Sequence, residues 1–485
     1  MNTVSVFARK YFSAIALIIL IADLTYSFIQ HYHANMDGDM ASIIMPGDSY
    51  SHVMNDPLGS DALFRQEIYV APNRYFAHAA MSVYFKTVPL MLQRFMNPID
   101  SLYVSCAIAK TLIQAFIILL LSSYISGSIN FFSKRFLAAA IIVTPLFHTT
   151  GYYIYTGVID HSITYTFFFA LPVSLLLLYF LPFYLLVINQ KEIQFRFFWW
   201  LLWCGFALTI ALNGPLNPGI VLTSAVVFIS FVFISWYYPR SIPANSLNIS
   251  KPIERNQNAF SKYFIPLIAF SGYSLYIGTF NAENFNNPIP LMERYSRLPE
   301  GLFNMVFTKA GFVLLIIAIM LNLFLLKKYL DDKDYKKIMT AVIFLAVFII
   351  IYILLLPLGG YRNYRPDILR RDTFLPVTLI IFFLFGFTTL KLSVINFKGK
   401  ILYRSVVFIL LCIFWYADKP AKNETLCERA ALKTIAETGN EIVKLESNCT
   451  VLSWEPVTDY RESEVNAKFL QYLKITKHKT RYYRQ

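Results

Sequence analysis

Residues 31–78 read HYHANMDGDMASIIMPGDSYSHVMNDPLGSDALFRQEIYVAPNRYFAH, a polar stretch that follows the first apolar segment of the chain. It gathers acidic, basic and histidine side chains, whereas the chain as a whole is 56% hydrophobic and only 15% charged. A loop that merely connects two apolar helices rarely keeps such varied polar chemistry. We therefore interpret this stretch as the candidate reaction site, and the rest of the chain as the scaffold that presents it.

The composition is typical of an integral membrane protein. The chain has 485 residues and a mean hydropathy of +0.51, and its repeated long apolar runs cannot all be hidden in one soluble core. The formal net charge is +14. Its basic residues lie mostly in short connectors between apolar runs, as membrane topology alone produces. We therefore exclude nucleic acid as a partner.

Eleven segments are apolar and long enough to be predicted as membrane-spanning helices. They are 11–30, 101–121, 136–150, 163–188, 197–213, 219–238, 263–280, 306–326, 338–357, 373–390 and 401–416. A twelfth segment, 75–93, carries His78, Lys86 and Pro89 and is interpreted as an amphipathic helix at the membrane interface. The first segment follows Arg9 and Lys10 without a cleavage site, which indicates an uncleaved signal anchor.

The positive-inside rule favours this arrangement. If 75–93 does not cross, the basic connectors all lie on the cytoplasmic side with the N-terminus. The external side then holds the 31–100 loop, 151–162, 213–218, 281–301, 359–372 and the tail. The predicted fold is an all-α polytopic membrane protein, with a membrane module over 1–416 and a small external C-terminal domain over 417–485.

Two of the five cysteines lie in the polar tail. Cys427 and Cys449 are 22 positions apart, and in an oxidising compartment they would form a disulfide. The other three lie within apolar segments, where small packing residues are expected.

The first candidate motif is Asp37-Gly38-Asp39, close to the end of the first apolar segment. A tight turn can present two such carboxylates near the membrane surface, where one could act as a general base or both could hold a divalent cation. A solvated turn is the alternative, since Asp and Gly are ordinary turn residues.

The second motif runs from Arg65 and Glu67 through Asn73 to Arg74 and His78. Asn73 can cap the following helix, on which Arg74 and His78 share one face. That face could bind a phosphate or a sugar. It could equally be the polar anchor of an interfacial helix.

The third motif is an external loop with four arginines within ten residues. Its candidate binding residues are Tyr361, Arg362, Tyr364, Arg365 and Arg371. The planar guanidinium is suited to bidentate phosphate binding, and we favour anion binding over ion pairs with nearby acids.

The fourth motif is Asp160-His161 in the second external loop. The pair could bind a metal or a substrate, although capping of the next helix by Asp160 or Ser162 explains it as well.

Two charged residues lie within predicted spans. Asp23 and Lys110 fall at similar depths at 1.5 Å per residue, and charges inside a membrane are normally paired. We therefore predict an Asp23–Lys110 ion pair that locks the first two spans together.

The order of these features resembles the GT-C class of membrane glycosyltransferases, which use polyprenyl-phosphate sugars. An anchor helix is followed by an external loop that opens with acids, then by the interfacial segment NRYFAHAAMSVYFKTVPLMLQ and a span that begins SLYVSCAIAK. A second external loop with an acid, Asp160, and a late arginine-bearing loop complete the match. The acids are split by Gly38 rather than adjacent, so the chain resembles an outlying, bacterial member located in the inner membrane.

The resemblance implies an inverting sugar transfer to a glycan or lipid acceptor on the external leaflet. Asp37 or Asp39 would deprotonate the acceptor, and Arg362, Arg365 and Arg371 would neutralise the departing phosphate. Arg74 and His78 would hold donor or acceptor, and Asp160 could support a divalent cation, which is not required in every member. The alternatives are a polymerase or ligase of lipid-linked polysaccharides, or a lipid or glycan transporter.

Overall fold

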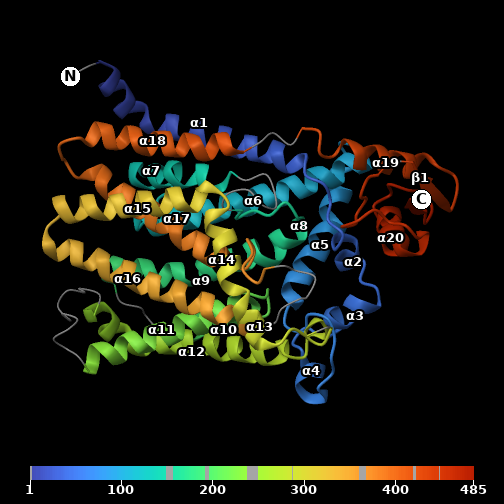
Figure 1. Cartoon of the computed structure of the whole chain (residues 1–485), viewed down its shortest axis with the longest axis horizontal. Coiled ribbons are helices and arrows are strands. Elements are labelled where there is room, and N and C mark those ends of the chain that lie inside the picture. Colours follow the sequence, from blue (N-terminus) through green and yellow to red (C-terminus); the bar gives the residue numbers. More distant parts are fainter. Residues whose placement is uncertain are drawn as a thin grey trace.

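Eleven helices of the computed structural model run alongside one another as a bundle (Figure 1). The structure describes residues 3–148, 157–191, 196–237, 250–286, 288–359, 367–418, 422–446 and 448–484. The eleven helices are α1 (Thr3–Tyr32), α6 (Pro98–Ser126), α7 (Lys134–Val143), α9 (Leu171–Ile188), α10 (Phe197–Ala211), α11 (Asn217–Tyr237), α12 (Ser250–Gly278), α15 (Ala310–Tyr329), α16 (Asp332–Leu355), α17 (Leu375–Val394) and α18 (Lys400–Ala417). Each predicted apolar segment corresponds to one of them.

Shorter elements link these helices. They are the helices α8 (Ile163–Tyr165), α13 (Leu291–Ser296) and α14 (Leu298–Phe307), a π-helical turn (Thr166–Ala170) and 3₁₀ turns at Thr144–Phe147, Ala282–Asn284 and Leu356–Gly359. The π turn joins α8 to α9, so the predicted 163–188 segment is helical throughout. The predicted 136–150 segment is shorter as an α-helix, because α7 gives way to a 3₁₀ turn at Thr144.

Seven helical stretches of the described residues are long and apolar enough to cross a membrane. They are Tyr11–Tyr32, Pro98–Ser126, Ile163–Ile188, Ala310–Tyr329, Asp332–Gly359, Leu375–Val394 and Lys400–Ala417. The outward faces of the bundle carry large apolar side chains in the open, among them Ile18, Phe228, Phe324, Ile350 and Phe408. Such a surface suits lipid rather than water. The protein is therefore an all-α, multi-pass membrane protein.

The ends of α6, one of the two most buried candidate spans, are fixed locally. The side chain of Asn97 accepts a hydrogen bond from the amide of Asp100, and Pro98 occupies the first turn. Gly127 ends the helix at φ +70°, a left-handed conformation that costs glycine little. Near this C-terminal end, α17 approaches closely because Gly386 has no side chain; a Cβ there would lie 2.5 Å from Cδ1 of Ile125.

One end of the bundle, hereafter the loop end, carries the polar stretch. Here α2 (Met40–Ile44), α3 (Asp48–Asn55) and α4 (Ser60–Arg65) lead into α5 (Tyr75–Leu92), which runs across the direction of the long helices (Figure 1). The predicted cap of α5 is wrong. The N-cap position is Arg74, and the Asn73 side chain instead donates a 3.0 Å hydrogen bond to the carbonyl of Ser274 on α12.

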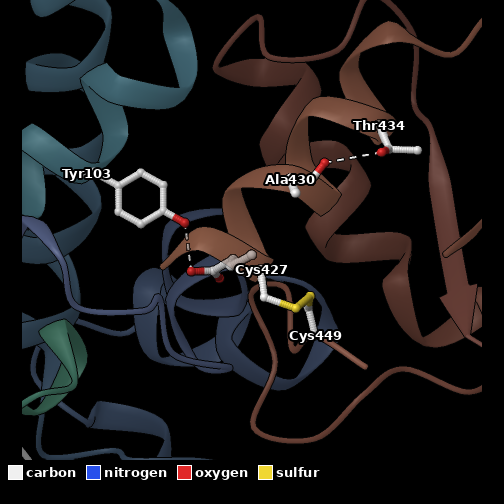
Figure 2. Close-up of a disulfide and its surroundings, with 6 residues drawn as sticks. Tyr103, Cys427, Ala430, Thr434 and Cys449 are labelled. Carbon is white, nitrogen blue, oxygen red and sulfur yellow. Dashed lines mark hydrogen bonds between the residues drawn. A yellow bond between two sulfur atoms is a disulfide. The ribbon is translucent and has the colours of Figure 1, made fainter. Parts of the chain in front are cut away.

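The C-terminal segment forms a small domain at the loop end. It comprises α19 (Leu426–Glu437), β1 (Ile442–Leu445), a 3₁₀ turn (Tyr460–Ser463), α20 (Glu464–Tyr472) and β2 (Arg481–Arg484), with β1 and β2 paired in parallel. The predicted Cys427–Cys449 disulfide is present (Figure 2). Leu432, Phe469 and Tyr482 share one apolar core with Met40 on α2 and Phe85 on α5. The tail is thus docked onto the first loop.

Candidate functional site

Asp37 is buried at the loop end, where the first and second loops meet. Its carboxylate accepts four hydrogen bonds, two from the hydroxyls of Ser162 (2.6 Å) and Thr164 (2.8 Å) and two from the amides of Thr164 (2.9 Å) and Asp39 (3.1 Å). Ser162 is also the N-cap of α8. A carboxylate at a helix N-terminus is stabilised by unpaired amides and by the helix dipole. Asp37 therefore fixes the first loop to the start of the α8–α9 helix.

Asp160 and Arg371 form a buried ion pair next to Asp37. Arg371 Nε lies 3.0 Å from Asp160 Oδ2, and Nη2 bonds the same oxygen. Asp160 Oδ1 accepts from the amide of Ser162. The arginine stem crosses Gly157, where any Cβ would collide with it. The second loop and the late arginine loop are thus joined by a charge-assisted contact from which water is largely excluded.

Lys110 completes what we call the buried cluster: Asp37, Lys110, Asp160 and Arg371. The side chain of Lys110 is 1% exposed, and its ammonium donates to the backbone carbonyl of His161. Asp37 and Asp160 both lie near enough to interact with it electrostatically. Two acids and two cations therefore balance one another in this cluster, as burial of charge requires.

The predicted Asp23–Lys110 ion pair is wrong. Asp23 Oδ1 lies 2.6 Å from Nε2 of His148, and Nδ1 of the same imidazole lies 3.0 Å from Oδ2 of Asp418. Asp23 faces the end of α7 and the end of α18, whereas Lys110 faces the second loop. Asp23 and Lys110 were predicted at a similar depth in the bundle, but they face different sides of it.

Asp39 is the less enclosed acid of the Asp37-Gly38-Asp39 turn. Its side chain is half-buried, and it occupies the N-cap position of α2 without a side-chain capping bond. The turn itself is packed against the tail domain: a Cβ on Gly38 would lie 2.6 Å from Cδ1 of Trp454. Glycine is therefore required between the two acids by the close approach of the tryptophan.

Aromatic and charged side chains surround this turn. The ring centre of Trp454 lies 6.0 Å from that of Tyr165. The guanidinium carbon of Arg370 also lies 6.0 Å from the centre of the Tyr165 ring. Arg370 also pairs with Asp372. A small pocket opens between Tyr165, Arg371 and Asp372. The pocket is lined by aromatic faces and an arginine, and its volume of about 10 Å³ suits a single water molecule.

Glu428 on α19 connects the tail domain to this site. Its carboxylate accepts hydrogen bonds from the Tyr103 hydroxyl at 2.7 Å and from the amides of Met36 at 3.1 Å and Leu452 at 3.4 Å. Figure 2 shows Tyr103 pointing toward the tail beside the disulfide. Burial raises the pKa of Glu428 to about 7. This acid thus holds both the residue before Asp37 and the loop that carries Trp454.

Arg429, the next residue, strengthens the same junction. Its guanidinium pairs with Asp100 at 2.6 Å and lies 3.6 Å from the ring centre of Tyr103 on α6. A stacked, ion-paired arginine is a strong interface contact.

The two predicted histidines differ in burial: His78 is buried, whereas the side chain of His161 is 25% exposed. Burial, with a smaller contribution from Arg74, lowers the pKa of His78 to about 3. Its ring lies between Tyr50 and Phe168, and neither ring nitrogen has a hydrogen-bond partner. Burial, then Lys110 and Arg371, lowers the pKa of His161 to about 3. A neutral imidazole can still donate or accept one hydrogen bond.

Arg65 and Glu67 lie away from the buried cluster. They belong to the α3–α4 region, at the other end of α5 from the tail domain (Figure 1). There they contact His52 and Asp61. Tyr361, Arg362, Tyr364 and Arg365 lie outside the described residues.

The structure thus brings Asp37, Asp39, Asp160, His161 and Arg371 together from three predicted motifs. Arg370 belonged to the predicted four-arginine motif without being named as a binding residue, and three further participants were not predicted: Glu428, Arg429 and Trp454. Arg370 precedes Arg371, and Glu428 follows Cys427, so each lies next to a residue that the sequence singled out. Nothing in the local sequence marked Trp454. No protein-family model matches the chain, and no curated protein matches its sequence at a significant level.

Proposed function

We propose that the protein is a membrane glycosyltransferase that transfers a sugar from a polyprenyl-phosphate donor to a cell-envelope glycan or lipid acceptor. The observation that carries the proposal is the convergence at the loop end. Acids from two loops, arginines from a third and a tryptophan from the tail domain gather at one end of an apolar helix bundle. A donor with a lipid tail and a charged sugar head would need both environments at once.

Asp39 is the better candidate for the general base. Asp37 is 3% exposed and already accepts four hydrogen bonds, so taking a proton would break part of the network that fixes the turn. The Asp39 side chain is half-buried at the edge of that turn. In this proposal Asp39 takes the proton of the acceptor hydroxyl, whose oxygen bonds to the anomeric carbon with inversion as the bond from that carbon to the phosphate oxygen breaks and the polyprenyl phosphate leaves. Asp37 positions the turn.

The donor phosphate would be neutralised by arginines. Arg371 is already paired with Asp160, which makes it a positioning residue for the late loop. Arg362 and Arg365 on that loop would meet the departing phosphate, and Arg370 above Tyr165 would stabilise the negative charge that develops. Asp160, which the sequence suggested as support for a divalent cation, is paired with Arg371.

The proposed topology has eleven spans, the N-terminus inside, and the loop end outside in a bacterial inner membrane. The arrangement in Figure 1 supports it, because the N-terminus and the α15–α16 and α17–α18 connections lie at the end of the bundle opposite the tail domain. Those two connections carry basic residues from Lys327 to Lys337 and from Lys391 to Lys400. A reporter fused at Gln485 should appear on the external side; a cytoplasmic signal would reverse the assignment.

The test is a transfer assay with the purified chain in lipid nanodiscs and polyprenyl-phosphate sugars as donors. Asp39→Asn should lower kcat by about 10²–10⁴-fold, as expected for loss of a general base. Asp332→Asn, which changes an exposed acid at the start of α16, is the matched control. Asp39→Asn activity equal to that of the control would remove the general-base role.

The same assay separates the main rival. A polymerase or ligase of lipid-linked polysaccharides would depend on the arginine loop and not on Asp39. Loss of activity in Arg365→Ala with full activity in Asp39→Asn would favour that rival.

A further inference from the structure

A second polar group at the loop end lies outside the proposed transfer site. We call it the loop cluster: His52 on α3, Asp61 and Arg65 on α4, and Glu67 just beyond α4. His52 Nε2 lies 2.9 Å from Asp61 Oδ2 and 3.6 Å from Glu67 Oε2. One donor atom from each of the three residues falls within 4.8 Å of the others.

These distances match those between ligands of one metal ion. Ligands at about 2.0–2.1 Å in a tetrahedral site are roughly 3.3–3.4 Å apart. The two measured separations from His52 lie on either side of that value. The cluster could therefore close on an ion with small side-chain adjustments.

Arg65 does not occupy the position of such an ion. Its Nη1 lies 3.2 Å from Oδ1 of Asp61 and 3.8 Å from Oε1 of Glu67. These are the outer oxygens, whereas Oδ2 and Oε2 point toward His52. Each carboxylate thus turns one oxygen to the arginine and one to the imidazole. An ion bound by the inner oxygens would leave Arg65 in place as an outer-shell partner.

The backbone around the three residues is held by a buried acid. Asp56 accepts hydrogen bonds from the amide and hydroxyl of Ser60, the amide of Asp61 and the hydroxyl of Tyr69. Burial alone would raise the pKa of Asp56, but these hydrogen bonds together bring it below its ordinary value. Tyr69 also stacks on the His52 ring, with centres 3.9 Å apart and planes at 4°. Tyr69 therefore orients the His52 imidazole and is itself anchored to Asp56, the acid that shapes the loop.

We propose that His52 Nε2, Asp61 Oδ2 and Glu67 Oε2 bind one divalent transition-metal ion, with Zn²⁺ as the best fit. One imidazole with two carboxylates suits Zn²⁺ and its neighbours, whereas Mg²⁺ and Ca²⁺ prefer oxygen ligands alone. The three ligands are half-exposed, so the ion has a path from solvent and a fourth position open to water or another ligand. This site is independent of the proposed sugar transfer.

The competing interpretation is a surface ion-pair network, with a protonated His52 between two carboxylates. It uses the same contacts but predicts no metal binding. The two interpretations also differ in their dependence on Arg65. Removal of the arginine would weaken an ion-pair network, but would leave a metal site intact or make it tighter.

The experiment is a titration of the full-length, untagged chain in detergent after treatment with a chelator and its removal. Zn²⁺ is added and followed by calorimetry, and Co²⁺ is followed by its visible absorption, which reports tetrahedral geometry. We expect one saturable equivalent per chain. His52→Ala should weaken binding by about 100-fold or more, since loss even of outer-shell partners costs 10–100-fold.

The controls are chosen to match. His478→Ala removes an exposed histidine of the tail domain and should leave the titration unchanged. If His52→Ala does not fold, Glu67→Gln tests the same ligand set at a side chain that is 41% exposed. No saturable equivalent in the wild-type chain, or equal binding by wild type and the ligand variants, overturns the proposal. Neither result affects the sugar-transfer proposal, which is measured separately.

Discussion

The buried cluster and the loop cluster are built from the same kinds of groups, yet their surroundings differ. Each has two carboxylates and at least one cation, and both lie at the loop end of the bundle. In the buried cluster the side chains are at most 8% exposed. In the loop cluster the His52, Asp61 and Glu67 side chains are 28–41% exposed. The buried cluster joins loops to one another because its side chains are enclosed. The loop cluster is partly exposed and can therefore bind a ligand.

The two clusters differ in the hydrogen-bond and ion-pair partners of their carboxylates. Asp37 and Asp160 are satisfied by hydroxyls, amides and a buried arginine from distant parts of the chain. Asp61 and Glu67 are satisfied by neighbours in the same short loop. The first arrangement specifies a tertiary fold, and the second specifies only a local geometry. Stability should therefore respond strongly to changes in one cluster and weakly to changes in the other.

The largest expected effect is at the Asp160–Arg371 pair. Asp160→Asn leaves a buried guanidinium without its partner, which should lower the free energy of unfolding by about 3–5 kcal/mol. Adding Arg371→Gln should recover much of that loss. Unfolding in mixed micelles measures both. The control is Glu464→Gln in the half-exposed pairs of α20, expected to cost less than about 1 kcal/mol. Equal losses in test and control would remove the distinction between the clusters.

The next effect concerns the tail domain that covers the buried cluster. Replacing Cys427 and Cys449 by Ser opens a loop of 22-residue separation and should destabilise the tail by about 3 kcal/mol. Faster trypsin cleavage within 422–484 would report it. Cys412→Ser, an exposed cysteine on α18, should change nothing. Unchanged cleavage in the double variant would mean that docking alone holds the tail.

Tail docking should also depend on pH through Glu428. Burial raises its pKa from 4.5 to about 7, so the docked state keeps a proton that the undocked state releases near pH 4.5. Docking is therefore strongest below that pH and weakens by roughly 3 kcal/mol as the pH rises to about 7, then levels off. Thermal unfolding at pH 5 and pH 8 measures the difference. Glu428→Gln should abolish it, whereas Glu437→Gln at the end of α19 should retain it.

The smallest effect is expected in the loop cluster. Arg65→Ala removes a guanidinium whose side chain is 69% exposed, so the unfolding free energy should change by less than about 1 kcal/mol. Chemical denaturation alongside the Asp160→Asn variant provides a direct comparison. A loss of several kcal/mol would show that the loop cluster, too, is a structural joint.

The helices were predictable because twenty-residue apolar runs leave few alternatives. Each expected segment overlaps a helix, although 136–150 gives way to a 3₁₀ turn, and α5 lies across the bundle (Figure 1). Sequence spacing did not predict contacts that depend on which side of its helix a residue faces. Residue counting placed Asp23 and Lys110 at one depth, but it could not say that Asp23 faces His148 on another side. Asn73 similarly has a capping residue's identity but bonds a carbonyl of α12.

Part of the candidate site was predictable from loop chemistry. Asp37, Asp160 and Arg371 were each singled out, and they meet in the fold. The different roles proposed for Asp37 and Asp39 were not predictable, because only their contacts distinguish the enclosed Asp37 from the more open Asp39. The contribution of Trp454 depends on a glycine more than four hundred positions earlier. No local pattern encodes such a contact.

The docked tail has a consequence for how the protein is made. The core that includes Met40 and Phe85 is completed by Leu432, Phe469 and Tyr482, which are translated more than three hundred residues later. Synthesis proceeds from the N-terminus, so the first loop stays partly unpacked until the tail domain has been translated. The acids of the 37–39 turn gain their helix, their arginine and their tryptophan in that order. A chain that lacked the tail domain would leave this core incomplete.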